Sequence, residues 1–274
     1  MKKFLMVTLL LSSSLASANT KAIFAGSDTL AGMMTDAIIA AGMDQQIQYL
    51  GGGSGNAEKG MISGDQGLGP MSREVKAEVT QQLGVQGVNL VGHVIALDGI
   101  GVFVKADNTT ASLDVKTVSR IFTCELTKWE QIAGSGMRGD IKVYRRNDAS
   151  GTTDAFKHFT GVKNFGACVT ALNETADIAE VTSRDSQAIA YAGLSGKTQE
   201  NRTVALSASV GAPAVLPTTA TVRDFSYPFA RRLYVYEVTG ARGASEVELQ
   251  LLSYLTDRSF MDPIVQSHEF ITID

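Results

Sequence analysis

The sequence predicts an α/β protein built as two similar lobes. Two observations support this fold class: short apolar strands alternate with helical patterns along most of the chain, and the alternating pattern occurs twice. Such alternation is typical of a largely parallel sheet flanked by helices. Two lobes with the chain passing between them leave a cleft, and clefts between domains are favoured places for a small ligand.

The first set of elements begins with the strand-like segment KAIFAGS and a helix over about 29–41. The strand IQYLGG and a helix over about 56–63 follow. After LGPMSREV we expect a polar helix and then a long strand, VNLVGHVIALDGIGVFV, at 88–104. This first set predicts one α/β lobe.

The second set contains a helix near 114–122, the strand IKVYRR, a helix over about 152–160 and the strand AIAYAGL. The last third of the chain returns to strand with RLYVYEV. It closes with EVELQLLSYLTD, whose apolar positions recur at helical spacing. This second set predicts a lobe similar to the first.

The first 18 residues, MKKFLMVTLLLSSSLASA, have the order of a secretory signal peptide. Two lysines precede a short apolar run, and small residues end the segment. The run is too short to span a bilayer. We therefore expect cleavage after Ala18 and an exported, soluble mature protein without membrane insertion.

Charge and cysteine content exclude several classes of function. Loss of Lys2 and Lys3 with the signal changes the formal charge from −4 to −6. An acidic balance argues against nucleic acid as a partner, because nucleic acid is held mainly by spread positive charge. Cys124 and Cys168 most simply form one disulfide in an oxidising compartment, and the absence of CxxC disfavours a redox role. Three scattered histidines show no zinc spacing, so we expect no metal and no cofactor.

Three segments share one design: an apolar strand, a turn rich in Gly, Ser or Thr, and the start of a helix. They are FAGSDT at 24–29, LGGGSGN at 50–56 and RRNDASGTTDAF at 145–156. Glycine permits close backbone approach, hydroxyls can donate, and a helix start offers free N–H groups and partial positive charge. Each turn is therefore a candidate anion seat. The simpler interpretation is that Ser27, Asp28, Ser54 and Ser150 are ordinary helix caps. Three such turns in one chain favour a ligand.

These turns and other segments resemble those of the phosphate-binding subunits of high-affinity phosphate ABC transporters, of the PstS type. The resemblance extends from about Ile23 to Phe270 and keeps the family's motif order. The segments that carry it are GSDT, GGGSGNAEKGMISGD, GPMSREV, HVIALDGIGVFV, IFTCELTKWEQI, VYRRNDASGTTDAF, AIAYAGL and SYPFARRLYVY.

The resemblance implies a two-lobed, type II periplasmic binding protein fold. Each lobe is expected to hold a mixed, mostly parallel sheet flanked by helices, with the ligand cleft at the hinge. The implied organisation is a signal peptide at 1–18, lobe 1 from 19–104 and 222–274, and lobe 2 from 105–221. The implied function is periplasmic capture of inorganic phosphate by a monomer that delivers it to an ABC permease and has no enzymatic activity.

The implied phosphate ligands come from both lobes. Arg146 is the one cation expected in direct contact, because a guanidinium grips two phosphate oxygens and stays charged when buried. Arg73 is a second candidate, which we expect to brace the cleft by pairing with an acid such as Asp148. The full set implied by the motifs is Ser27, Asp28, Thr29, Ser54, Gly55, Ser72, Arg146, Ser150, Gly151 and Thr152.

Asp28 departs from the family pattern, which usually has Ser or Thr there. Many members instead place an Asp in the turn that here contains Ser72. An ionised carboxylate can only accept hydrogen bonds, so beside an oxyanion it needs a proton between them. Our hypothesis is that Asp28 accepts the proton of phosphate and so rejects sulfate. The alternative is that Asp28 caps the helix beginning near Thr29.

Three other functions remain open from the sequence. The same fold could bind another oxyanion, such as sulfate, molybdate or a phosphonate. The protein could also sense or scavenge phosphate. A secreted phosphoester hydrolase is a further alternative, because Ser150 lies at a tight turn before a helix. The pattern GxSxG is missing, however, and His158 lies about two helical turns away from Ser150.

Overall fold

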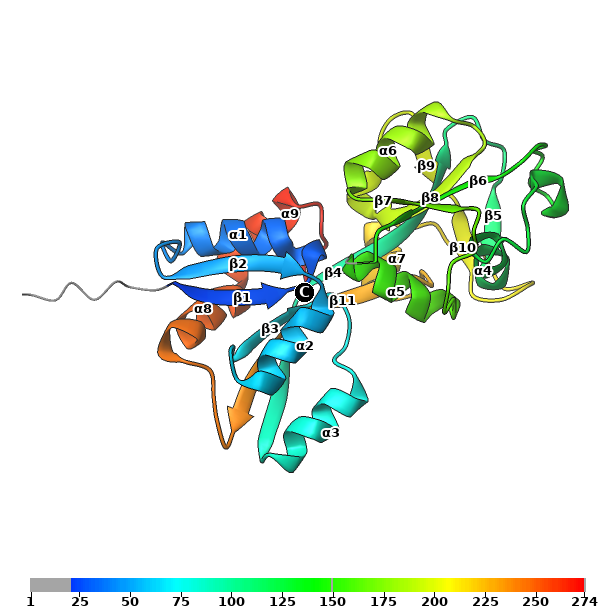
Figure 1. Ribbon diagram of the computed structural model, residues 1–274. Coiled ribbons are helices and arrows are strands. Elements are labelled where there is room, and N and C mark those ends of the chain that lie inside the picture. The colour runs from blue at the N-terminus through cyan, green and yellow to red at the C-terminus, as the bar shows by residue number, and fades with distance from the viewer. Residues whose placement is uncertain (1–20, 149, 274) are drawn as a thin grey trace, which may run out of the picture.

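The computed structural model describes residues 21–148 and 150–273. The expected signal peptide at 1–18 lies outside the described residues. Two α/β lobes lie side by side, joined by two long strands, β4 (Val88–Lys105) and β11 (Ala230–Gly240) (Figure 1). The predicted two-lobed α/β fold class is confirmed. Among the described residues, no helix is both long and apolar enough to cross a membrane.

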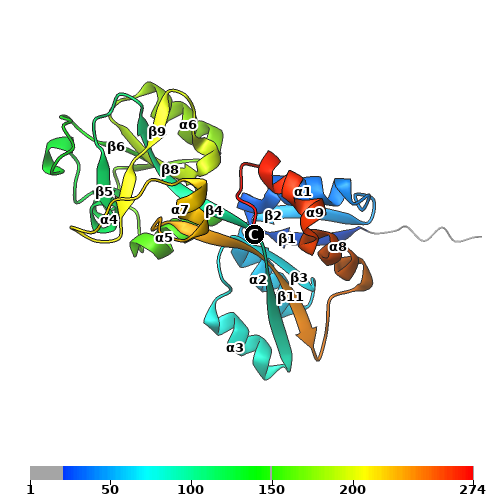
Figure 2. The ribbon, with the colours of Figure 1, turned by 180° about the vertical axis from the view of Figure 1, so that it is seen from behind.

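Lobe 1 is built around a parallel strand pair and an apolar core. Strands β1 and β2 pair in parallel, and β3 pairs antiparallel with β11. Helices α8 and α9 lie against α1 (Figure 2). The core contains Phe24, Met33, Leu68 and Leu251. The elements of lobe 1 are β1 (Ala22–Gly26), η1 (Asp28–Leu30), α1 (Ala31–Ala40), β2 (Ile47–Gly52), α2 (Ser54–Ser63), β3 (Leu68–Met71), α3 (Ala77–Val85), α8 (Glu246–Thr256) and α9 (Arg258–Ser267).

Lobe 2 has its own core, which is rich in aromatic side chains. Phe156 stacks on Tyr191 with ring centroids 3.8 Å apart, and Phe122 packs against both rings. Trp129 is fully buried in this core. The elements of lobe 2 are β5 (Ser112–Asp114), α4 (Val115–Phe122), η2 (Trp129–Gln131), β6 (Lys142–Arg146), α5 (Gly151–Thr160), β7 (Val169–Leu172), α6 (Thr175–Arg184), β8 (Ala188–Gly193), η3 (Leu194–Gly196), β9 (Asn201–Thr203), β10 (Ala205–Ser207) and α7 (Thr219–Arg223).

The hinge is the antiparallel pair of β4 and β11. The two strands pair from Ala230 opposite Gly99 to Gly240 opposite Val88. Beyond Gly99, residues 100–104 of β4 pair with β8 of lobe 2. A single strand therefore runs from the sheet of lobe 1 into that of lobe 2. The lobe boundaries expected near residues 104 and 222 stay a prediction, because this strand belongs to both lobes.

The strand pairing is more mixed than the alternation pattern alone indicates. Parallel pairs lie within the lobes, β1 with β2, β5 with β10, and β6 with β7 and β8. The hinge strands β4 and β11 make antiparallel pairs. The helix α6 and the terminal helix α9 were not among the elements expected from the sequence. Pro263 lies inside α9, which weakens the helical signal there.

One disulfide joins Cys124 to Cys168 within lobe 2, as expected from the sequence. Cys124 follows α4, and Cys168 immediately precedes β7. The bond therefore ties the end of a core helix to an edge strand across a separation of 44 residues. A cross-link of this span limits the conformations of the unfolded chain.

We predict that the double variant Cys124→Ser/Cys168→Ser is less stable by about 4 kcal/mol, as the chain-entropy model gives for a loop of this length. Chemical denaturation followed by circular dichroism measures the change. Adding reductant to the unmodified protein provides the matched comparison, and should lower the midpoint by a similar amount. A loss below about 1 kcal/mol in both experiments would contradict a stabilising role for the cross-link.

Candidate functional site

Lobe 1 presents three turns at its junction with lobe 2, each following a strand. Ser27 follows β1, Ser54 begins α2 after β2, and Ser72 follows β3; all three side chains are buried. The Ser72 N–H donates to Ser54 Oγ at 3.2 Å, and the two hydroxyl oxygens are 3.4 Å apart. Ser27 Oγ is buried and has no hydrogen-bond partner among the described residues. The turns thus gather hydroxyl groups at one edge of the lobe.

Glycines shape the second turn. Gly52 and Gly53 have φ values of 105° and 96°, which residues with a Cβ atom rarely adopt. This backbone turns β2 directly into α2. At Gly55, in the first turn of α2, an added Cβ would meet open space. The glycines therefore bend the chain and leave room in front of the helix start.

Asp28 connects the first two turns. Its Oδ1 accepts the Gly52 N–H at 2.7 Å, and its Oδ2 is buried without a hydrogen-bond partner among the described residues. Burial and the nearby Asp28 carboxylate raise the pKa of Tyr49 far above its ordinary value. The Tyr49 hydroxyl consequently stays protonated and donates to the Ser27 carbonyl at 2.8 Å. Asp28 makes no capping bond to its own helix, so the cap interpretation is wrong.

Lobe 2 contributes the first turn of α5. Ser150 is the N-cap, and its Oγ accepts the Thr152 N–H at 3.2 Å. Ser150, Gly151 and Thr152 are all buried. The positive end of the α5 dipole therefore lies where the two lobes meet.

The two lobes touch through these turns. Thr29 Oγ1 of lobe 1 lies 3.3 Å from Thr152 Oγ1 of lobe 2. A Cβ added to Gly151 would come within 2.2 Å of Ser72 Oγ and 3.0 Å of Ser27 Oγ. The start of α5 can approach lobe 1 this closely only because residue 151 lacks a side chain. Predicted site residues from both lobes thus meet at one place.

Arg146, at the end of β6, is anchored within lobe 2 at the start of α6. Its Nε donates to the Asn173 carbonyl at 3.0 Å, and its Nη1 donates to Thr175 Oγ1 at 2.7 Å. Burial lowers the pKa of the Arg146 guanidinium, while the charges of Glu174 and of Asp28 across the cleft oppose that effect. Asp28 and Arg146 are thus within electrostatic reach of each other across the two lobes.

Arg73 braces the cleft, but not through Asp148. It forms a two-pronged pair with Glu58 at 2.7 and 2.9 Å, and its Nε lies 3.9 Å from Asp154 of α5. Burial raises the pKa of Glu58, yet the hydrogen bonds from Arg73 and the Lys76 N–H hold that pKa below its ordinary value. Asp148 instead pairs with Arg145 at 2.9 Å and Lys157 at 3.6 Å. The expected partner is therefore corrected to Glu58, with Asp154 on the opposite lobe.

Sequence reasoning missed a third arginine where the lobes meet. Arg231 of β11 is buried against Asp98 of β4, and it also reaches the first turn of α5. A signal was present in the sequence, because Asp98 interrupts an otherwise apolar strand segment. Buried charges in such strands are rarely found unpaired.

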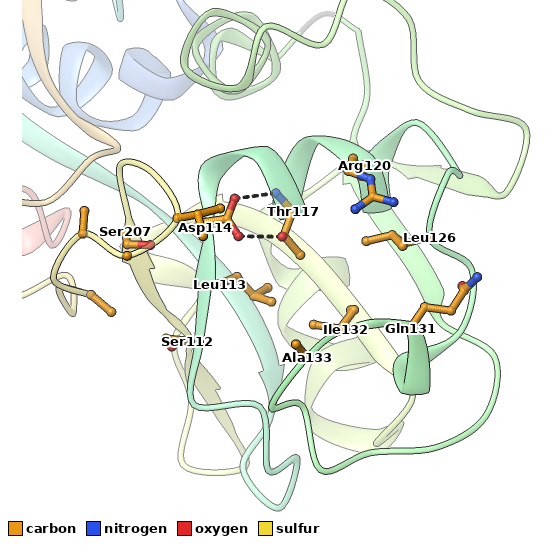
Figure 3. Close-up of a pocket in the computed structure, with 14 residues that line it drawn as sticks. Ser112, Leu113, Asp114, Thr117, Arg120, Leu126, Gln131, Ile132, Ala133 and Ser207 are labelled. Carbon is orange, nitrogen blue, oxygen red and sulfur yellow. Dashed lines mark hydrogen bonds between the residues drawn. The ribbon is translucent and has the colours of Figure 1, made fainter.

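Other features of the molecule lie apart from these residues. A cavity of about 430 Å³ in lobe 2 is lined in part by Leu113, Asp114, Arg120 and Ile132, and by none of the predicted ligand residues (Figure 3). Asp114 is already engaged there as the cap of α4. Within the described residues, no group of three or more His, Cys, Asp or Glu side chains could hold a metal ion.

Comparisons with known proteins agree with this architecture. A family model described as a PBP superfamily domain matches residues 13–259. The phosphate-binding protein PstS of Pseudomonas aeruginosa is 30% identical over 229 residues, which cover 77% of this chain and 70% of that protein. PstS of Staphylococcus aureus strain USA300 is 24% identical over 218 residues, covering 78% of this chain and 66% of that protein.

Solved structures show the same fold. An ABC-type phosphate transport receptor from Vibrio cholerae has a TM-score of 0.78 at 17% identity, covering 92% of this chain and all of that one. A putative phosphate ABC transporter substrate-binding protein from Clostridium perfringens, with bound phosphate, has a TM-score of 0.74 at 22% identity, covering 93% of this chain and all of that one. The chain belongs to the PBP superfamily and, within it, to the family of PstS phosphate-binding proteins.

Proposed function

We propose that this protein captures inorganic phosphate in the interlobe cleft and delivers it to the permease of an ABC transporter, and that it works in the periplasm. The observation that carries the proposal is the meeting of hydroxyl-bearing turns from both lobes, with the half-buried Arg146 guanidinium near enough to interact with the Asp28 charge. The membership of the PstS family supports the choice of ligand.

The arrangement suits a small, multiply charged oxyanion. Ser27, Ser54, Ser72 and Thr152 bring hydroxyls, and the starts of α2 and α5 bring backbone N–H groups. Arg146 supplies a full positive charge that burial does not neutralise. Many short dipoles and one cation can therefore hold an anion locally, although the chain as a whole is acidic.

Closure follows from ligand contacts to both lobes. An anion that touches the turns of lobe 1 and the α5 start of lobe 2 binds the closed form more tightly than the open form. It therefore shifts the population toward closure by that difference in affinity. A closed complex is the form that we propose docks on the permease.

Binding, rather than hydrolysis, is the activity that the site supports. Ser150 accepts a hydrogen bond as the cap of α5. The His158 ring instead contacts Phe159 edge to face. Neither contact gives Ser150 a general base, which a serine nucleophile requires.

We predict that calorimetric titration of the mature protein shows one phosphate site and no binding of sulfate. The reason is that the Asp28 carboxylate favours an anion that carries a proton, and phosphate carries one near neutral pH. The same preparation should leave a chromogenic phosphoester intact over hours. Phosphate binding that is undetectable, or steady release of the chromophore, would refute the proposed function.

We predict that Arg146→Ala weakens phosphate binding at least tenfold, because a hydrogen-bonded charge contact is lost at the anion. The neighbouring Arg145→Ala is the matched control, since Arg145 pairs with the exposed Asp148 and lies over the Phe165 ring. The control should change the affinity less than about threefold. Equal affinities for the two variants would remove Arg146 from the binding set.

We predict that Asp28→Asn lowers phosphate affinity and allows sulfate to bind. An amide can donate a hydrogen bond to a deprotonated oxyanion, whereas a carboxylate repels it. Competition calorimetry with both anions measures the change. Asp65→Asn, on an exposed turn of the same lobe, serves as the control and should keep the wild-type preference. An Asp28→Asn protein with unchanged phosphate affinity and continued rejection of sulfate would rule out the selective role.

A further inference from the structure

A buried ion pair links the two hinge strands at the point where they enter lobe 2. Arg231 donates to Asp98 Oδ2 from Nε at 2.9 Å and from Nη2 at 2.6 Å. The two residues lie directly opposite each other in the antiparallel register of β11 and β4. Their side chains are only 4% and 2% exposed. Asp98 thus holds the guanidinium in a fixed place inside the hinge.

The same guanidinium reaches beyond the hinge to the anion seat of lobe 2. Arg231 Nη1 donates to the Gly151 carbonyl at 3.1 Å, and Nη2 donates to Thr152 Oγ1 at 3.2 Å. Thr152 Oγ1 in turn lies 3.3 Å from Thr29 Oγ1 of lobe 1. A continuous chain of polar contacts therefore runs from Asp98 through Arg231 and Thr152 to the opposite lobe.

The direction of these hydrogen bonds follows from the chemistry of the groups. A guanidinium can only donate, so the Thr152 oxygen must act as the acceptor from Arg231. The single hydrogen of the Thr152 hydroxyl cannot be used toward Arg231 and is free for another acceptor; between Thr152 and Thr29 either hydroxyl can donate. A hydroxyl that accepts from a cation is also polarised and becomes a stronger donor. The Thr152 hydroxyl is thereby prepared to donate to an acceptor in the cleft.

We propose that Arg231, held by Asp98, is a positioning residue for anion binding. It fixes the Thr152 hydroxyl as a donor toward the cleft and aligns the first turn of α5, without touching the anion itself. This inference rests on the proposed function, since it assigns a role in the same phosphate site. Arg231 and Asp98 lie on the two strands that join the lobes. These strands would therefore contribute directly to the affinity for phosphate.

A double-mutant cycle between Arg231 and Thr152 tests the proposal. Phosphate affinity is measured by calorimetry for the wild type, Arg231→Lys, Thr152→Val and the double variant. Lysine keeps the charge beside Asp98 but lacks the planar fork that reaches Thr152 and Gly151. We expect Arg231→Lys alone to weaken binding about tenfold or more, and to weaken it less than about threefold in the Thr152→Val background.

Two further variants separate positioning from simple stabilisation. Thr152→Ser retains the hydroxyl that accepts from Arg231, so adding Arg231→Lys should still weaken phosphate binding about tenfold or more in this background. Arg202→Lys is the matched control, because the Arg202 guanidinium holds backbone carbonyls of Asn108 and Thr110 within lobe 2. This control should lower the unfolding temperature without changing phosphate affinity.

Folding is monitored separately, because breaking a buried ion pair is often strongly destabilising. The paired replacement Asp98→Leu/Arg231→Met leaves no unpaired buried charge and should remain folded while binding phosphate at least tenfold more weakly. Additive effects of Arg231→Lys and Thr152→Val, or wild-type affinity in the folded Asp98→Leu/Arg231→Met protein, would overturn the positioning role alone. A wild-type protein that does not bind phosphate would overturn both this inference and the proposed function.

Discussion

The antiparallel pairing of β4 with β11 is the constraint on which the whole site depends. These strands leave the sheet of lobe 1, carry the Asp98–Arg231 pair, and continue toward lobe 2. Their ladder fixes the direction in which the lobes face each other. The turns after β1, β2 and β3 and the start of α5 lie at this junction, so their hydroxyl groups come together there.

We propose that the site binds charge mostly through dipoles, which allows an acidic protein to hold an anion. A protein with a formal charge of −4 does not attract anions through its overall field. Local donors can still do so when they are held in place before the ligand arrives. The glycines at 52, 53 and 151 permit the close backbone approach that this arrangement requires. The turns hold the hydrogen-bond donors in place, and the paired strands β4 and β11 hold the two lobes together.

Much of the fold and part of the site could be predicted from the sequence. The alternation of strands and helices gave the fold class, and the Gly- and Ser-rich turns marked Ser27, Ser54 and Ser150, which the structure brings to the cleft. Local patterns could not reveal that the hinge strands are antiparallel, because pairing direction depends on distant partners. The partner of Arg73 was missed for the same reason. Glu74 is nearer to Arg73 in the sequence than Glu58 is, and the packing of α2 against β3 is what brings Glu58 to Arg73.

The buried pair of Asp98 and Arg231 shows where sequence reasoning can be extended. A charge inside an apolar strand predicts a buried partner of opposite charge. When two strands of one chain carry opposite charges, the two residues are candidates to pair. The further contacts of Arg231, with Gly151 and Thr152, depend on how the two lobes lie against each other. Only three-dimensional structure shows that Arg231 reaches Thr152.

A crystal structure of the mature protein grown with phosphate tests the central claim most directly. The account requires one phosphate between the lobes, bound by the Arg146 guanidinium, the α5 start and the hydroxyls of lobe 1, with Arg231 still on Asp98 and outside contact distance of the anion. Phosphate bound to one lobe alone, or phosphate bound away from the hinge, would contradict it.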